Sequence, residues 1–209
     1  YHNMTNGTIV LVCFNRPDKL SETLACLKQT KQIERWKLVV VRQISDDPDC
    51  VQVAQIINSI DWIETTHLTT QYNTTETVVA KISKNVFTGL SYSFDTLKSN
   101  MSVLVEDDIC LGYDALTFFE TIINRYNDDP YFYAVNGFSY KTDVANLKFS
   151  YSKFRFGVGN GWAISKKKWD LFYKKKWPSI HQNGFDTGLE THIKTGYVIM
   201  PYAARTKDI

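Results

Sequence analysis

Three consecutive carboxylates are the clearest chemical signal in the chain. Glu106, Asp107 and Asp108 directly follow the apolar run at 103–105. Adjacent carboxylates repel one another unless a cation offsets their charge. Mn²⁺ or Mg²⁺ prefers oxygen ligands and can bridge two phosphate oxygens of a bound nucleotide. The alternative is an acidic helix start or loop, in which Asp107 or Asp108 simply caps the next segment. The apolar run in front of the triplet favours a metal site at the end of a buried strand.

A single arginine follows another apolar run. Arg16 comes after the β-branched segment at 8–14 and directly precedes Pro17. The planar guanidinium group suits a diphosphate or the edge of a nucleotide, because it donates two parallel hydrogen bonds. The alternative is an ordinary surface salt bridge. The residues alone leave both interpretations open.

Alternating strands and helices must position these groups. We expect strands at 8–14, 38–41, 63–68 and 101–105, and helices at 17–29, 51–59, 78–97 and 112–126. This order predicts an α/β fold with a mostly parallel sheet and right-handed crossovers. Ligands of such sheets bind beyond the carboxyl ends of the strands. That rule brings 15–16, 42–47 and 106–108 to one edge of the sheet.

Composition limits the class of protein. The chain has 209 residues, which suits one large α/β domain or two small ones. Its 24 basic and 22 acidic residues leave a net charge of +2, which argues against a nucleic-acid partner. No run of about 20 apolar residues predicts a membrane segment. We expect a domain excised from a longer chain.

The cysteines and sequons bear on the compartment. The four cysteines are not spaced as a zinc site or a CxxC pair, so we expect no disulfide framework and a buried free thiol at Cys13. Glycosylation sequons begin at Asn3, Asn6, Asn73 and Asn100. The sequons favour a lumen over the cytoplasm, although Asn and Thr are abundant enough for chance matches.

Several short motifs follow one another in the order found in a known enzyme family. They are IVLVCFNR at 9–16, VLVEDD at 103–108, FF at 118–119, GNGW at 159–162, WP at 177–178, FD at 185–186 and ART at 204–206. In this series the chain resembles the inverting GT-A glycosyltransferases N-acetylglucosaminyltransferase I and protein O-mannose N-acetylglucosaminyltransferase. The chain has Asp186-Thr187 where that family has two aspartates. We expect Trp162 to lie in the core rather than against a sugar.

The resemblance implies a fold and a division of the chain. The fold would be of the GT-A type, a Rossmann-like and mostly parallel sheet flanked by helices, with a smaller acceptor-side half. Within the single domain 1–209, about 1–110 would bind the nucleotide sugar and about 111–209 would bind the acceptor and hold the catalytic base.

The resemblance also assigns roles around the donor. Asp108 would bind the metal, Mn²⁺ or Mg²⁺, while Glu106 and Asp107 contact the nucleotide sugar. Arg16 would contact the nucleotide. Asn85 lies where the family has another nucleotide-contacting residue, and Asp46 would contact uracil. Its neighbours Ser45 and Asp47 remain alternatives for that contact.

The resemblance supplies a candidate base as well. Asp186 would take the proton of the acceptor hydroxyl as that oxygen attacks the anomeric carbon, with inversion. The alternative is a helix N-cap. Glu190 is the second candidate base, or an ordinary exposed helical residue.

The expected reaction is transfer from a UDP-sugar to a glycan or glycoprotein acceptor. The alternatives are a retaining GT-A glycosyltransferase and a non-catalytic sugar-binding or scaffold domain. A nucleotidyltransferase is disfavoured because no glycine-rich loop follows the segment at 8–14. The expected compartment is the Golgi lumen of a eukaryotic secretory cell, with the cytoplasm as the alternative.

Overall fold

The computed structural model of the chain describes residues 6–73, 75–140, 149–155, 158–177 and 196–209. Among the helices of these segments, none is long and apolar enough to cross a membrane. The remaining residues, which include Asp186 and Glu190, lie outside the described part.

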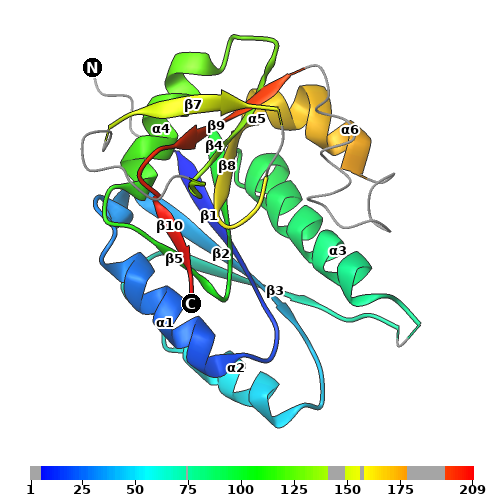
Figure 1. Ribbon diagram of the computed structural model, residues 1–209. Coiled ribbons are helices and arrows are strands. Elements are labelled where there is room, and N and C mark those ends of the chain that lie inside the picture. Colours follow the sequence, from blue (N-terminus) through cyan, green and yellow to red (C-terminus); the bar gives the residue numbers. More distant parts are fainter. Residues whose placement is uncertain (1–5, 74, 141–148, 156–157, 178–195) are drawn as a thin grey trace.

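Strands and helices alternate through the first half of the chain, as the sequence predicts (Figure 1). The elements are β1 (Gly7–Cys13), α1 (Pro17–Lys28), η1 (Ile33–Arg35), β2 (Trp36–Gln43), α2 (Pro48–Asn58), β3 (Thr65–Thr70), α3 (Val78–Ser91), η2 (Tyr92–Thr96) and β4 (Met101–Glu106). The helix expected at 78–97 is α-helical only to Ser91 and continues as the π-helical turn η2. In that turn Phe94 stacks on Trp169, with 5.5 Å between the ring centroids.

Shorter elements make up the second half. They are β5 (Ile109–Leu111), α4 (Ala115–Tyr126), β6 (Phe132–Asn136), β7 (Tyr151–Phe154), β8 (Trp162–Ser165), α5 (Lys166–Lys168), η3 (Trp169–Tyr173), α6 (Lys174–Lys176), β9 (Tyr197–Pro201) and β10 (Thr206–Asp208). Because β5 follows the acidic triplet, Asp107 and Asp108 lie in a turn between two strands. The helix start is therefore wrong, whereas a loop, the other half of the alternative, agrees with this turn.

Eight strands form one sheet in the order β3-β2-β1-β4-β8-β6-β9-β7. The first four are parallel to one another, as expected. Strand β8 runs antiparallel to both β4 and β6, and β7 runs antiparallel to β9. The second half of the chain thus extends the sheet of the first half across β4.

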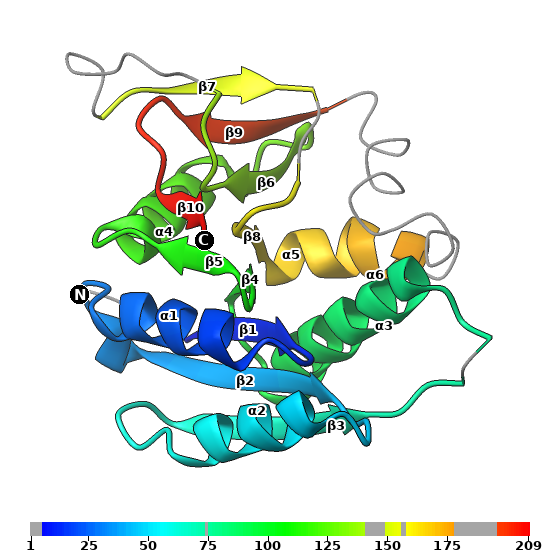
Figure 2. The same ribbon diagram turned by 60° about the horizontal axis from the view of Figure 1, so that its bottom comes forward.

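Helices cover both faces of this sheet (Figures 1 and 2). Ile9 and Leu11 of β1 pack with α1, α2 and α4 on one face. Val10 and Val12 pack with α3 and η3 on the other. Strands buried on both faces need a continuous apolar sequence, which explains the run in β1.

Gly89 lets α3 lie close to the sheet. A Cβ atom at this position would lie 2.3 Å from Cγ1 of Val10 and 2.9 Å from Cγ2 of Val41. Both contacts are far inside van der Waals distance, and β-branched side chains cannot move away in a packed core. The close approach brings the side of α3 that carries Asn85, four residues before Gly89, toward the carboxyl ends of β1 and β2.

A small second sheet lies beside the acidic turn. Strands β5 and β10 pair antiparallel, and β5 lies next to α1 with β10 on its far side (Figure 2). The backbone N–H of Ile209 donates to the carbonyl oxygen of Asp108 at 2.9 Å. Residues about 100 positions apart thereby hold the turn that carries Asp107 and Asp108.

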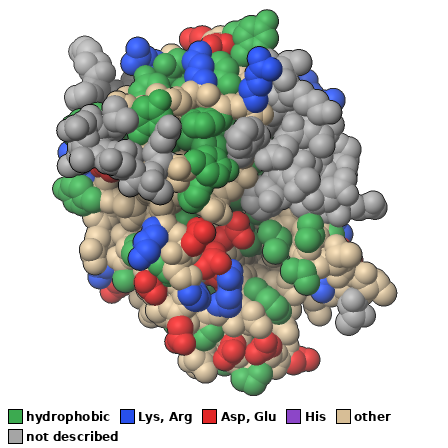
Figure 3. All heavy atoms as spheres, in the orientation of Figure 1, with side chains coloured by type: hydrophobic (Ala, Val, Ile, Leu, Met, Phe, Trp, Pro, Cys, Tyr) green, Lys and Arg blue, Asp and Glu red, His purple; other side chains and the backbone are tan. Residues whose placement is uncertain are grey.

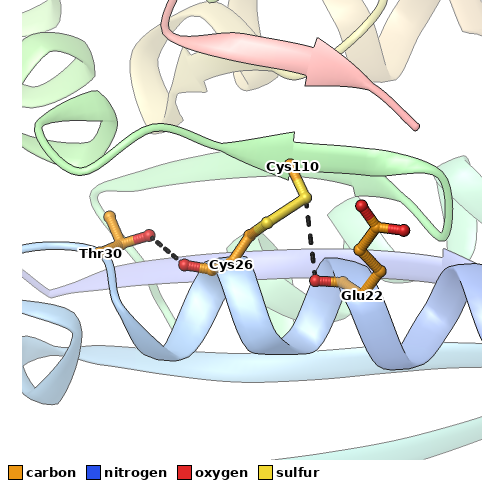
Figure 4. The surroundings of a disulfide bond; sticks show 4 residues. All are labelled: Glu22, Cys26, Thr30 and Cys110. Atoms are coloured by element: carbon orange, nitrogen blue, oxygen red, sulfur yellow. Dashed lines mark hydrogen bonds between the residues drawn. A yellow bond between two sulfur atoms is a disulfide. The ribbon is translucent and has the colours of Figure 1, made fainter.

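A disulfide joins α1 to β5 (Figure 4). Cys26 and Cys110 have Cα atoms 5.4 Å apart and are separated by 84 residues in the sequence. The expectation of no disulfide was wrong, because the spacing of cysteines does not reveal that a helix and a distant strand are neighbours. Cys13 is free and buried, as expected, and so is Cys50.

Reduction of this disulfide is expected to lower the free energy of unfolding by about 2–4 kcal/mol, because the link restricts the unfolded chain over a long loop. Urea unfolding with and without dithiothreitol measures the difference. The double variant Cys26→Ala/Cys110→Ala should be destabilised and should not respond to reductant. Cys50→Ala, which removes a buried free thiol, is the matched control and should keep the response. Equal stability of the oxidised and reduced wild type would contradict the link.

Candidate functional site

A cavity of about 400 Å³ opens at the carboxyl ends of the parallel strands. It lies where the strand order reverses, with β2 on one side of β1 and β4 on the other. This switch point is the usual ligand site of an open α/β sheet. The ends of β1, β2 and β4 and one face of α3 line the cavity through Val12, Cys13, Phe14, Asn15, Arg16, Gln43, Val78, Lys81, Ile82, Asn85, Glu106 and Asp107.

The acidic turn presents two carboxylates in different surroundings. The side chain of Asp107 is only 2% exposed, whereas that of Asp108 is 31% exposed. Oδ2 of Asp107 accepts the backbone N–H of Phe14 at 3.3 Å. Burial raises the pKa of the Asp107 carboxyl above its ordinary value, while the charge and hydrogen bond of Arg16 oppose this shift. Asp108 is the more accessible ligand for a cation.

Arg16 joins the two carboxylates. Its Nη2 pairs with Asp107, and its Nη1 donates to Oδ2 of Asp108 at 2.7 Å. The residue lies at the N-cap of α1, directly after β1, where Pro17 begins the helix. Its side chain remains 45% exposed at the mouth of the cavity. The guanidinium group supplies one positive charge for two adjacent acids.

The acidic turn fits part of a metal site. Among the described residues, no group of three or more His, Cys, Asp or Glu could hold a metal ion. Mg²⁺ is commonly held by one or two carboxylates together with substrate phosphates, and such a site needs few protein ligands. Asp108, which is 31% exposed beside the buried Asp107, provides one accessible carboxylate for such a site. A cation here would depend on a bound phosphate to complete its coordination.

The loop after β2 differs from the expectation in detail. Asp46 is exposed and is not among the described residues that line the cavity. Asp47 caps α2 by accepting the N–H of Asp49 at 3.0 Å, and it also accepts Nδ2 of Asn15 at 2.7 Å. Gln43 lines the cavity instead. Its place as the last residue of β2 was the signal that could have identified it.

One face of α3 forms the opposite wall. Val78, Lys81, Ile82 and Asn85 are spaced by three and four residues, so they lie on the same side of the helix. Of these, only Asn85 was expected in the site. The other three lie three, four and seven residues before Asn85, and this helical spacing would have predicted them.

The remaining candidates either lie outside the described residues or pack in the core. Asp186 and Glu190 lie outside the described residues, so their expected roles remain predictions. Trp162 is 1% exposed and packs in the core with Val10 and Leu104, as expected. Gly161 precedes it with φ +81°, and a Cβ there would lie 2.5 Å from Thr206. The GNGW turn therefore serves close packing.

The exposed charges are mixed on the face drawn in Figure 3. Acidic and basic side chains lie next to one another near the middle of this face. No extended patch of one sign is visible there. This distribution agrees with the small net charge of +2.

Comparisons of sequence find no relatives. No protein-family model matches the chain, and no curated protein is similar to it in sequence. Similar proteins are found among solved structures instead.

The fold is similar to that of solved glycosyltransferases. A mannosyltransferase from Pyrobaculum calidifontis in complex with GDP-Man and Mn²⁺ matches 96% of this chain, with 16% identity and a TM-score of 0.59. TarS of S. aureus in complex with UDP matches 96% with 12% identity and a TM-score of 0.64. GalNAc-T7 with UDP, GalNAc and Mn²⁺ matches 100% with 10% identity and a TM-score of 0.64.

These matches establish the fold class. The chain spans 55%, 59% and 44% of the lengths of the three structures. At such low identity the likeness concerns the fold alone. The protein has the GT-A fold, a mixed α/β sheet flanked by helices.

Replacing Arg16 by Ala leaves the buried Asp107 without its main counter-charge. With an allowance for the exposure of Arg16, we expect a loss of about 1–2 kcal/mol in the free energy of unfolding. In the background of Asp107→Asn the same replacement should cost less than about 0.5 kcal/mol, because the buried charge is absent. Urea unfolding at neutral pH in EDTA measures both. Equal costs in the two backgrounds would show that the ion pair does not stabilise the turn.

Proposed function

We propose that the protein is a metal-dependent glycosyltransferase that moves a sugar from a UDP-sugar to an acceptor hydroxyl. The arrangement that carries the proposal is Arg16, which lines the switch-point cavity of a GT-A fold with Asp107 and also pairs with Asp108 beside the lining. The similar structures support it, because their names include GDP-Man and Mn²⁺ in one case and UDP, GalNAc and Mn²⁺ in another. Their proteins are longer than this chain, so their activities reach it only as part of the proposal.

The acidic turn would hold the cation and the diphosphate. Asp108 is the metal ligand because it is the more exposed carboxylate. Asp107, fixed by the N–H of Phe14, and Glu106 at the end of β4 would orient the nucleotide sugar. Arg16 can turn toward the phosphates, since nearly half of its side chain is exposed. When bound, Mn²⁺ or Mg²⁺ stabilises the negative charge of the departing diphosphate.

Inversion is the part of the proposal that rests on the sequence motifs. An acceptor oxygen forms a bond to the anomeric carbon as the bond from that carbon to the phosphate oxygen breaks. The acceptor proton passes to a carboxylate, assigned to Asp186 with Glu190 as the second candidate. A retaining enzyme of the same fold would use the same cation site without a base at Asp186.

The proposed acceptor and compartment follow from the glycosyltransferases that the sequence motifs resemble. The acceptor would be a glycan or glycoprotein. The Golgi lumen is supported by the Cys26–Cys110 disulfide, since disulfides form in oxidising compartments. The sequon residues Asn6, Asn73 and Asn100 are exposed, as glycosylation requires.

A panel of UDP-sugars and GDP-sugars, each with Mn²⁺ or with EDTA, tests donor binding through the melting transition. We expect one nucleotide sugar to stabilise the protein only with metal, by about 2.7 kcal/mol at 100 times its Kd. Asp108→Ala should abolish the metal-dependent stabilisation. Asp61→Ala is the control, because Asp61 is exposed and lies before β3, away from the carboxyl ends of the strands. If no nucleotide sugar shifts the transition, a sugar-binding or scaffold role replaces the proposed activity.

Asp186→Asn tests the assignment of the base. The variant should bind the donor as the wild type does, while transfer falls by about 10²–10⁴-fold because the proton acceptor is lost. Donor hydrolysis, with water as the acceptor, provides the rate, and proton NMR reports the anomeric configuration of the released sugar. Glu190→Gln tests the second candidate in the same way, and Asp61→Asn, at an exposed position outside the proposed site, is the matched control. Release with retained configuration would argue for the retaining alternative, whereas full activity of Asp186→Asn with inverted configuration would move the assignment of the base to Glu190.

A further inference from the structure

Asn85 is held in one orientation by two hydroxyl groups. The residue is only 3% exposed. Its Oδ1 accepts a hydrogen bond from Oγ1 of Thr70 and another from the phenol oxygen of Tyr72, each at 2.7 Å. An amide oxygen has two lone pairs, so both are occupied. The orientation of the amide group is therefore determined by its oxygen.

The nitrogen of this amide is on the arm that the two hydroxyls leave open. Asn85 lines the cavity, whereas Thr70 at the end of β3 and Tyr72 just beyond it do not. Because both hydroxyls bond the Oδ1 arm from outside the lining, we infer that the Nδ2 arm is the one that meets the cavity. Among the described contacts of Asn85, both involve the oxygen, and Nδ2 keeps two N–H groups for a ligand.

The cavity has a charged end and a largely neutral end. Arg16 after β1 and Glu106 and Asp107 at the end of β4 line the charged end, and Arg16 also pairs with Asp108 beside it. Gln43 and the face of α3 lie toward β2, where Lys81 is the charged residue of the lining. If the proposed function holds, the diphosphate occupies the end with Arg16 and the cation. The base then lies beside α3, within the region that Asn85 faces.

Bases differ in what they offer to an N–H donor. Uracil presents O4 and guanine presents O6, which accept hydrogen bonds. Cytosine and adenine present amino groups at the corresponding positions, and these are donors. A donor that faces a donor leaves two buried polar groups unsatisfied. A fixed Nδ2 can therefore distinguish the two classes of base.

We propose that Thr70 and Tyr72 are positioning residues that fix Asn85 as a hydrogen-bond donor to a base carbonyl. The site thereby selects a uracil or guanine nucleotide over a cytosine or adenine nucleotide. This inference rests on the proposed function and adds the rule by which the nucleotide is chosen. Thr70 and Tyr72 act only through the amide of Asn85.

Calorimetric titration of UDP, GDP, CDP and ADP with Mn²⁺ tests the inference. The wild type should bind UDP or GDP at least about tenfold more tightly than CDP and ADP. In Thr70→Val/Tyr72→Phe the amide is free to rotate, and this ratio should fall to about threefold or less. Thr88→Val removes a hydroxyl that bonds Lys84 on the same helix, and it should keep the wild-type ratio.

Two further variants keep the test decisive. Asn85→Asp offers oxygen acceptors in both arms and should shift the preference toward CDP and ADP, which loss of structure alone cannot do. Tyr72→Phe alone should give an intermediate ratio if the double variant does not fold. Melting of each variant without nucleotide verifies its fold.

The outcomes separate the two proposals. Equal weakening of all four nucleotides, or an unchanged ratio in the double variant, overturns the positioning role while Mn²⁺-dependent binding still supports a transferase. A wild type that binds none of the four nucleotides with Mn²⁺ overturns both.

Discussion

The side chains of Asp107 and Asp108 carry like charges next to each other at the end of a buried strand, and the surrounding structure must balance and hold them. Arg16 balances them because β1 and β4 are adjacent and parallel, so the residue after β1 meets the turn after β4. The N–H of Phe14 adds a fixed donor to Asp107. The geometry of the candidate site thus follows from the pairing of two central strands.

The other side of the turn is held by long-range links. The Cys26–Cys110 disulfide ties β5 to the helix whose N-cap is Arg16. The pairing of β5 with β10 adds a second link, and Ile209 donates to the carbonyl of Asp108. Carboxylates confined in this way lose little conformational entropy when a cation binds, which favours a preorganised site.

The neutral end of the cavity depends on packing instead of charge. Gly89 allows α3 to approach β1 and β2, and this contact places Asn85 between the end of β3 and the cavity. The two hydroxyls of β3 and its following loop then determine which atom of the amide a ligand meets. A charge cluster and a packed helix therefore define opposite ends of one cavity.

The sequence by itself determined the local elements and the type of chemistry. Apolar β-branched runs specified β1, β2 and β4, the proline after Arg16 marked the start of α1, and the acidic triplet after a strand indicated a cation site. These features are readable because backbone preference and hydrophobic periodicity act between near neighbours. The sequence also predicted that 15–16 and 106–108 share one edge of the sheet, but tertiary structure alone decided which side chains pair there. The pairing of Arg16 with Asp107, the link between Cys26 and Cys110 and the contact of Thr70 with Asn85 join segments distant in sequence. Only the packing of strands and helices brings such segments together.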